Sequence, residues 1–192
     1  MCSSDLRSGR VDELVAGTVS DVDAAEKVLG YRLRVPHLGA VLWVHETGAQ
    51  QDQLTRFTRA AATIAEELGA RGTPLLVPHD RATAWAWFAV PEETVPDLGA
   101  LASRLATVGE PPVPRLALGR AASGVEGFRR THLEALQAQQ VATVGDDPRR
   151  SVTGFDEPGL KVASLLTHDL DTTRSEEHTS ELQSPCNLVC RL

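Results

Sequence analysis

The chain has 192 residues with 19 Lys or Arg and 26 Asp or Glu, so its formal net charge is −7 at pH 7. An acidic chain lacks the positive surface that binding to nucleic acid or to an anionic membrane requires. It contains no apolar run of transmembrane length and no signal-peptide pattern, and we expect a cytoplasmic location. Its length suffices for one ordinary core.

The predicted elements of the first half alternate between helix and strand. Residues 11–29 have partial helical periodicity, with Asp21 as an N-cap inside the stretch and Gly30 at its end. Residues 38–44 carry apolar side chains on both faces, which is typical of a central strand. Residues 51–68 form an amphipathic helix. The apolar positions of that helix are Leu54, Phe57, Ala61, Ile64, Ala65 and Leu68.

The second half begins with a hairpin and continues the alternation. Two short apolar runs flank a loop over residues 79–83 that lacks glycine, which predicts a hairpin without a tight two-residue turn. The predicted elements are strands 74–78 and 84–90, helix 98–108, strand 115–119, helix 125–144, strand 151–155 and helix 159–170. The long helix 125–144 has an apolar stripe of Phe128, His132, Ala135, Gln139 and Ala142, and polar cover from Arg129, Arg130, Glu134, Gln137 and Gln140.

This order of elements predicts an α+β fold. Strands that alternate with helices, together with one hairpin, indicate a mixed sheet with helices packed on it, covered on one face. The plan is similar to the ferredoxin-like arrangement of nucleotide cyclase domains. Residues 7–30 would then be a helical leader or linker ahead of the sheet.

The two ends of the chain differ in character from the rest. The string RSEEHTSELQS, which begins at Arg174, is what a sequencing adapter gives when its DNA is translated in frame. MCSSDL, at residues 1–6, corresponds to the complementary strand of that adapter. We therefore interpret residues 1–6 and 174–192 as adapter-derived artefacts and the rest as a gene fragment. All three cysteines lie in these end segments, so no disulfide framework or cysteine metal knuckle is expected.

Several strings in the interior resemble a known family. YRLRVPHLGAVLWV, AWAWF, LALGRAASGVEGFRRTHLEALQAQQVA and SVTGFDEPGL are similar to the GGDEF-like domain of the PucR/CdaR family of bacterial transcriptional regulators, particularly its actinomycete members. The resemblance covers about residues 14–170, and residues 118–142 are its most specific part.

The resemblance implies a regulatory role. Residues 31–173 would form the GGDEF-like regulatory domain, preceded by a sensory domain and followed by a C-terminal helix-turn-helix that binds DNA. That helix-turn-helix would start shortly after Thr173, and it is absent from this chain. The implied module is not catalytic, couples sensor to DNA reader, and acts as a homodimer or homo-oligomer. No cofactor is expected.

The residues themselves argue against cyclase chemistry. A working cyclase needs a glycine pair in the hairpin and an acidic residue there to help hold a divalent metal. Here the loop has no glycine and a single carboxylate, Asp80, while His45 and Glu46 end the first strand. We interpret Glu46 and Asp80 as solvated loop carboxylates and expect no catalytic, cofactor or metal site. The alternatives are a divergent cyclase that uses these two carboxylates to hold a metal, and a small-molecule or nucleotide sensor without turnover.

Other polar residues favour structural roles. The histidines outside the end segments (His37, His45, His79, His132 and His168) show no HxxxH or HxH spacing. His132 lies on an apolar stripe, which indicates a packing histidine with satisfied hydrogen bonds. Arg129 and Arg130 are interpreted as a solvated helix face. Ser103 and Ser123 lack the G-x-S-x-G pattern of hydrolases. Three glycines, Gly119, Gly124 and Gly127, fit no phosphate-loop spacing, and we expect a turn and a close helix approach there.

Trp85 and Trp87 lie two positions apart on one hairpin strand. They share one face of that strand, whereas Ala84, Ala86 and Phe88 share the other. Each indole projects a large apolar area with an N–H group that needs a partner. We interpret the pair as packing beneath the helices. A dimer contact or an effector platform is the alternative.

Overall fold

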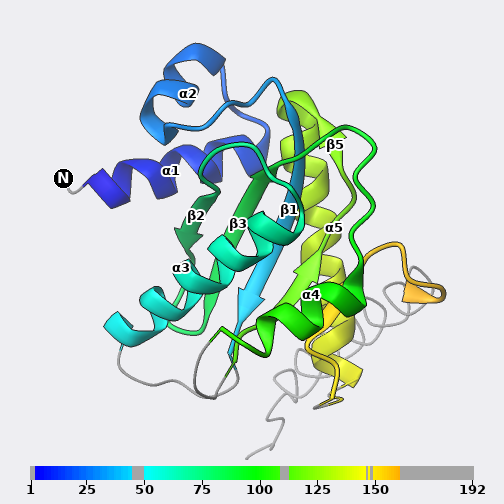
Figure 1. Ribbon diagram of the computed structural model, residues 1–192. Helices are drawn as coiled ribbons and strands as arrows, with labels where there is room; N and C mark the ends of the chain where they lie inside the picture. Colours follow the sequence, from blue (N-terminus) through cyan, green and yellow to red (C-terminus); the bar gives the residue numbers. More distant parts are fainter. Residues whose placement is uncertain (1–2, 45–49, 109–112, 146, 148, 161–192) are drawn as a thin grey trace, which may run out of the picture.

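The computed structural model describes residues 3–44, 50–108, 113–145, 147 and 149–160. Within these residues the chain forms helices and strands in alternation (Figure 1). The elements are α1 (Ser3–Ala16), α2 (Val22–Leu29), β1 (Pro36–Trp43), α3 (Gln50–Glu67), β2 (Leu75–Pro78), β3 (Thr83–Ala89), α4 (Leu98–Leu105), β4 (Arg115–Leu118), β5 (Ala122–Ser123), α5 (Gly124–Gly145) and β6 (Val152–Gly154).

The strands form one mixed sheet in the order β2-β3-β1-β4-β6. β4 and β6 run parallel, whereas β1 is antiparallel to both β3 and β4. The short β5 pairs with the start of β1, where Pro36 lies opposite Ser123. β1 is therefore the central strand, as its apolar residues on both faces predict.

Helices cover both faces of the sheet, so the prediction of one covered face is wrong. Figure 1 shows α3 and α4 on one side of β1 and α5 on the other. The cause lies in β1, whose residues from His37 to Trp43 are all buried. Leu42 packs in the cluster beneath α3 and α4, while Val41 packs in the cluster beneath α5. A strand with two apolar faces gains stability only where both are removed from water.

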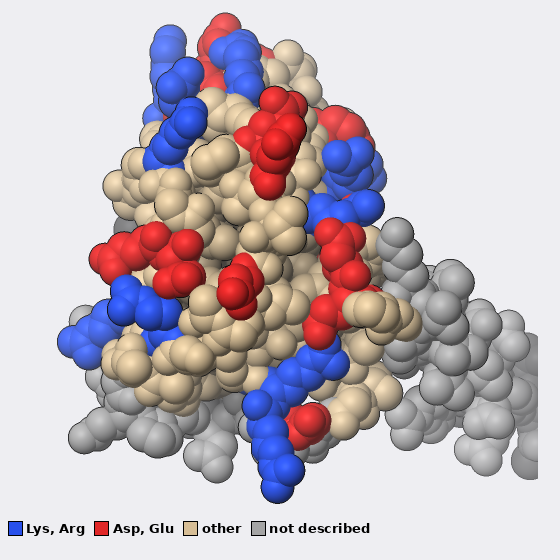
Figure 2. Space-filling model, turned by 45° about the vertical axis from the view of Figure 1, so that its right-hand side comes forward, with Lys and Arg blue, Asp and Glu red and all other residues tan. Residues whose placement is uncertain are grey.

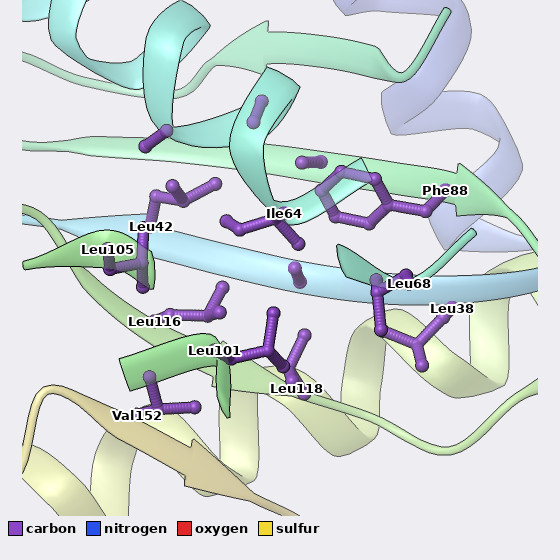
Figure 3. Packing of buried hydrophobic residues seen from close by; sticks show 14 of the residues in the cluster. Leu38, Leu42, Ile64, Leu68, Phe88, Leu101, Leu105, Leu116, Leu118 and Val152 are labelled. Atoms are coloured by element: carbon purple, nitrogen blue, oxygen red, sulfur yellow. The ribbon is translucent and has the colours of Figure 1, made fainter. Parts of the chain in front are cut away.

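The face beneath α3 and α4 holds an aliphatic core (Figure 3). Its fully buried members include Leu38, Leu42, Ile64, Phe88, Leu101, Leu105, Leu116 and Leu118. The predicted stripe of α3 supplies Phe57, Ala61, Ile64 and Leu68 to this core. Leu54 is 46% exposed, against the prediction, and Gln53 is buried instead. The buried face of α3 therefore begins at Gln53, one position before Leu54, the residue that the apolar periodicity predicts.

The amino-terminal segment is two helices rather than the single helix predicted over residues 11–29. Gly17 has a φ of 74°, a left-handed conformation, at the end of α1. Asp21 then caps α2, because its Oδ1 accepts a hydrogen bond of 3.0 Å from the Ala24 amide. Both helices contribute to one core with α5, since Leu14 and Leu29 are fully buried in the same cluster as Phe128.

The remaining element boundaries agree with the predictions within a few residues. β2, β3, α4, β4, α5 and β6 each lie at a predicted position. β5 has only two residues and was missed, because so short a strand carries no periodicity. The predicted helix over 159–170 extends beyond Leu160 and lies outside the described residues.

Candidate functional site

The hairpin loop between β2 and β3 is closed by its own residues. The amides of His79 and Asp80 both donate to the Thr83 carbonyl, at 3.0 and 3.2 Å. Asp80 Oδ1 accepts a hydrogen bond of 2.7 Å from the Ala82 amide. The single loop carboxylate thus stabilises its own turn. Its predicted partner Glu46, together with His45, lies outside the described residues.

No metal site assembles around this loop in the part of the chain that the structure describes. Among those residues, no group of three or more His, Cys, Asp or Glu side chains is placed to hold an ion. Asp80 itself is exposed and accepts the turn hydrogen bond from Ala82. The pairing of Glu46 with Asp80 stays untested.

A stack of aromatic rings connects the hairpin to α5. His79 stacks on Trp85, with ring centroids 4.1 Å apart and planes at 16°. His132 of α5 lies on Trp85 as well, with centroids 4.5 Å apart. The indole N–H groups of Trp43 and Trp85 are buried, and neither finds a hydrogen-bond partner among the described residues. Where Trp43, Trp85 and His132 meet beneath α5, the rings therefore pack through their apolar surfaces rather than through hydrogen bonds.

His132 is a packing histidine, but its hydrogen bonds are not satisfied. The residue is fully buried, and neither ring nitrogen has a partner in the described part of the chain. Burial lowers the pKa of His132 to about 4, and the neighbouring His79 adds to the effect. The ring is neutral near pH 7 and packs as an apolar group. The predicted packing role is confirmed, whereas the described residues supply none of the predicted hydrogen bonds to this ring.

Trp87 packs beneath α5, as one of the two interpretations of the tryptophan pair states. Its ring is parallel to that of Phe128, with centroids 4.2 Å apart and planes at 5°. Its indole N–H donates to the Phe128 carbonyl at 3.0 Å. The side chain is fully buried, whereas Trp85 is partly exposed. The opposite face of β3 places Phe88 in the aliphatic core, which confirms the predicted alternation.

A second histidine, His37, is held by two hydrogen bonds at the start of β1. Its Nε2 lies 2.9 Å from the Leu33 carbonyl, and its Nδ1 lies 3.1 Å from the Tyr31 hydroxyl. This arrangement fits a neutral ring that donates from Nε2 and accepts from Tyr31. Burial lowers the pKa of His37 and raises that of Tyr31. Sequence reasoning missed Tyr31, because a single tyrosine before a strand gives no signal of its partner.

Glycines let α5 approach the sheet closely, as predicted. A Cβ on Gly119 would lie 2.0 Å from the Thr131 carbonyl oxygen, and one on Gly127 would lie 2.6 Å from the Ala122 carbonyl carbon. Gly39 of β1 is confined to a lesser degree, since a Cβ there would lie 2.9 Å from the His132 amide nitrogen, and its own amide donates to Thr131 Oγ1 at 2.7 Å. Gly124 begins α5 with a φ of 75°. These glycines serve packing and a turn.

Two polar residues of α5 have roles that the sequence did not indicate. Glu134, predicted to lie on the polar face, is buried and accepts hydrogen bonds from the backbone amide and the guanidinium of Arg120. That contact raises the pKa of Arg120. Arg129 is not simply solvated, because its Nε donates to the Val15 carbonyl of α1 at 2.8 Å. Both side chains tether α5 to neighbouring segments.

Charges are mixed on the face that Figure 2 shows. Lys and Arg side chains alternate there with Asp and Glu, and they do not gather into one positive area. Ion pairs between opposite charges include Arg34 with Asp23 and Arg104 with Glu66. A polyanion needs a continuous positive surface, which this face lacks. None of the helices in the described residues has the length and apolar character needed to cross a bilayer.

Comparisons with known proteins agree with this architecture. None of the curated proteins compared with the chain matches it. The crystal structure of a regulator of polyketide synthase expression from Bifidobacterium adolescentis aligns with a TM-score of 0.56 at 16% identity, covering 92% of this chain and 64% of that one. At that identity the alignment shows a shared fold. The family model of the GGDEF-like domain matches residues 16–141, about two thirds of the sequence, and the chain therefore belongs to the GGDEF-like domain family.

Proposed function

We propose that this chain is a non-catalytic regulatory module of a PucR/CdaR-type transcriptional regulator. The observation that carries the proposal is the hairpin loop, in which Asp80 caps its own turn and no glycine opens the backbone to a nucleotide. Within the GGDEF-like family, a loop without the glycine pair expected of a working cyclase supports a role without turnover. The fold shared with a regulator supports the same role.

The module would transmit a signal rather than generate one. In this proposal a sensory domain precedes the chain, a DNA-binding helix-turn-helix follows it, and the module couples the two in the cytoplasm through dimerisation. Helix α5 is suited to such coupling, because it contacts the sheet and α1. Residues 1–6 and 174–192 would then be adapter-derived, residues 7–30 the leader and residues 31–173 the regulatory domain.

A turnover assay tests the absence of catalysis. The chain is incubated with GTP or ATP and with Mg²⁺ or Mn²⁺, and we expect no cyclic nucleotide above the level of a protein-free sample. Asp80→Ala is expected to behave identically. Asp12→Ala, a loss of an exposed carboxylate on α1, is the matched control. Turnover that Asp80→Ala abolishes and Asp12→Ala leaves intact would favour the divergent cyclase and overturn the proposal.

Two further measurements test the regulatory part. Sequencing the source DNA across codons 1–6 and 174–192 should show a reading frame that continues into a helix-turn-helix without adapter sequence. Encoded MCSSDL and RSEEHTSELQS ends would remove the basis for a DNA-binding role.

Sedimentation over a range of concentrations should show a dimer that dissociates on dilution, and a monomer at every concentration would contradict coupling through dimerisation.

A further inference from the structure

A cavity lies at the end of the sheet remote from the hairpin loop. It has a volume of about 250 Å³ and is bounded by the segment between α2 and β1, the segment between α3 and β2, and the end of β3. These three segments contribute Tyr31 and Arg32, Arg71 and Thr73, and Ala89 and Val90. The volume falls below the range of about 300 to 1,000 Å³ that is typical of drug-sized ligands. A molecule that fits it is small.

The walls of the cavity are held in place without a ligand. The Val90 amide donates to the Pro36 carbonyl at 3.1 Å, and the Arg71 amide donates to the Ala89 carbonyl at 2.7 Å. These two bonds join the segments that line the cavity. Tyr31 is buried and is fixed by its hydroxyl contact with His37. The site is therefore pre-formed, which lowers the entropic cost of binding.

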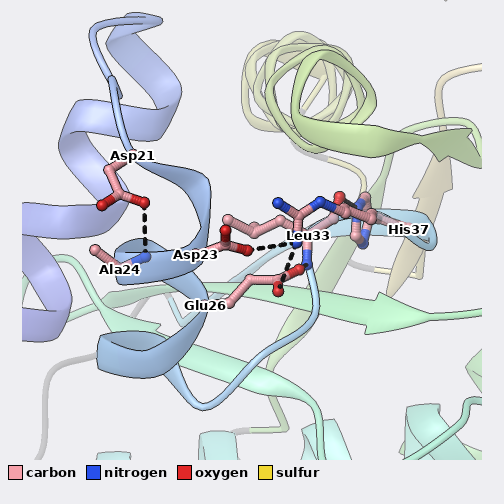
Figure 4. Close-up of polar contacts among 7 residues, drawn as sticks. Asp21, Asp23, Ala24, Glu26, Leu33 and His37 are labelled. Carbon is pink, nitrogen blue, oxygen red and sulfur yellow. Dashed lines mark hydrogen bonds and ion pairs between the residues drawn. The ribbon is translucent and has the colours of Figure 1, made fainter.

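The segment from Gly30 to Pro36 is also anchored to α2. Figure 4 shows Glu26 reaching across to the Leu33 amide, a hydrogen bond of 2.6 Å. Arg34 is paired with Asp23 at 2.7 Å and with Glu26 at 3.3 Å. The charge of Arg34 is thereby balanced within the protein. The anchor fixes the backbone directly after Arg32.

Arg32 and Arg71 differ from Arg34, because their charges are not balanced locally. Both are exposed, and neither forms an ion pair or a side-chain hydrogen bond with any residue that the structure describes. Glu92 and Glu93, which follow Val90, are not within ion-pair distance of either arginine in the described structure. Two arginines that contribute to one lining bring positive charge and N–H donors to it, and both suit a carboxylate.

Apart from Thr73 and the glycines Gly30 and Gly72, the rest of the lining carries apolar side chains or the Tyr31 ring. Val35, Pro36, Ala89 and Val90 contribute aliphatic surface, and Tyr31 contributes a ring whose hydroxyl is already occupied by His37. Such a surface gains free energy by covering an apolar group and offers little to a highly polar one. An inorganic anion would leave this surface uncovered. A ligand with both an anionic end and a compact apolar body matches the two halves of the cavity.

We propose that this cavity binds a small carboxylic acid with a compact apolar body, the carboxylate being held by Arg32 and Arg71. The inference concerns binding alone, and it holds whether or not the chain acts in transcription. The ligand would bridge the α2–β1 segment and the α3–β2 segment. Only Tyr31 would separate the ligand from His37 and Phe128, since Tyr31 contacts both rings.

The test uses the full ¹⁵N-labelled chain titrated with sodium benzoate at low ionic strength. We expect the amide signals of residues 30–35, 71–73, 89 and 90 to shift with one saturable dependence. Arg32→Ala and Arg71→Ala should each weaken binding about tenfold or more, the loss typical of a charge-assisted hydrogen bond. Arg59→Ala, which removes an exposed arginine on α3 away from the cavity, should leave binding unchanged.

Benzyl alcohol and inorganic phosphate separate the two halves of the proposal. Benzyl alcohol should bind at least about tenfold more weakly than benzoate, because it lacks the charge that the arginines would hold. Phosphate should bind weakly, because it covers no apolar surface. The proposal is overturned if benzoate shifts none of the lining amides, if benzyl alcohol binds as tightly, if phosphate binds more tightly, or if Arg59→Ala weakens binding as much as Arg71→Ala.

Discussion

The two faces of the central sheet are covered by different kinds of side chain. The cluster beneath α3 and α4 consists of aliphatic side chains together with Phe57 and Phe88, and none of its members is titratable. The face beneath α5 and α1 holds Trp87, Phe128 and Tyr31, and it buries His37 and His132 as well. The first face depends chiefly on apolar burial, with Gln53 as a buried polar residue of α3. The second depends also on which polar atoms have partners, and this difference predicts how each responds to mutation and to pH.

Loss of an aromatic ring from the aliphatic face should have the largest effect. Phe88 is fully buried there, and Phe88→Ala leaves a cavity that the closely packed leucines around it cannot fill. We expect the free energy of unfolding to fall by roughly 3–5 kcal/mol. Urea denaturation followed by circular dichroism measures it. The loss should be the same at pH 7 and at pH 5, because no titratable group belongs to this cluster. A loss that differs between the two pH values would contradict the view that the face beneath α3 and α4 is insensitive to pH.

A methyl group added beneath α5 should cost nearly as much. In Gly119→Ala the new Cβ would meet the Thr131 carbonyl oxygen at 2.0 Å, so α5 must move away from β4. We expect the free energy of unfolding to fall by about 3 kcal/mol, at the upper end for overpacking. The atom that the new Cβ meets belongs to the backbone of α5, which cannot rotate away as a side chain could. Gly9→Ala on α1 is the control, since a Cβ there meets nothing within 4 Å. It should be neutral or slightly stabilising, as alanine favours helix. Equal losses in both variants would contradict the close packing.

Acid should weaken the α5 face through His132. The folded pKa is about 4, against 6.5 for the free side chain, so the unfolded chain binds the proton more readily across this interval. Stability is therefore fully present above about pH 6.5 and is lost as pH falls toward 4. Between pH 7 and pH 5 the loss should be about 2 kcal/mol.

His132→Leu isolates this contribution. The substitution removes both unpartnered nitrogens and the titration, so the pH dependence between 7 and 5 should flatten by most of that amount. Some dependence remains, since burial lowers the pKa of His37 in the same direction. His79→Gln removes only the smaller, coulombic cause of the His132 shift, so it should reduce the slope far less than His132→Leu does. An unaltered slope in His132→Leu would show that His132 is not the titrating group.

The same contrast explains what the sequence could predict. Burial on both sides of β1, the stripe of α3 and the alternation along β3 follow from periodicity, because apolar side chains sort by face. The polar contacts of the α5 face do not. Glu134 looks like a surface residue until Arg120, fourteen positions earlier, is seen to bind it. Such partners meet only through the fold, and no local pattern records them.

The cavity was missed for a related reason. Arg32 and Arg71 are thirty-nine positions apart in the sequence and lie in segments without periodicity. Their common lining depends on Val90 bonding to Pro36 and on Arg71 bonding to Ala89, two contacts between separate segments. The hairpin loop, in contrast, could be interpreted directly, since the lack of glycine and the single carboxylate are local facts.

The smallest predicted effect separates the two tryptophans of β3 by their N–H groups. Trp87→Phe removes the donor to the Phe128 carbonyl, and we expect a loss of about 1 kcal/mol beyond that of the smaller ring. Trp85→Phe removes an indole N–H that has no partner among the described residues, so it loses no hydrogen bond. Urea midpoints of the two variants give the difference. If the two midpoints fall equally, the hydrogen bond of Trp87 adds nothing that the Trp85 N–H lacks. Water would then satisfy the buried indole N–H of Trp85.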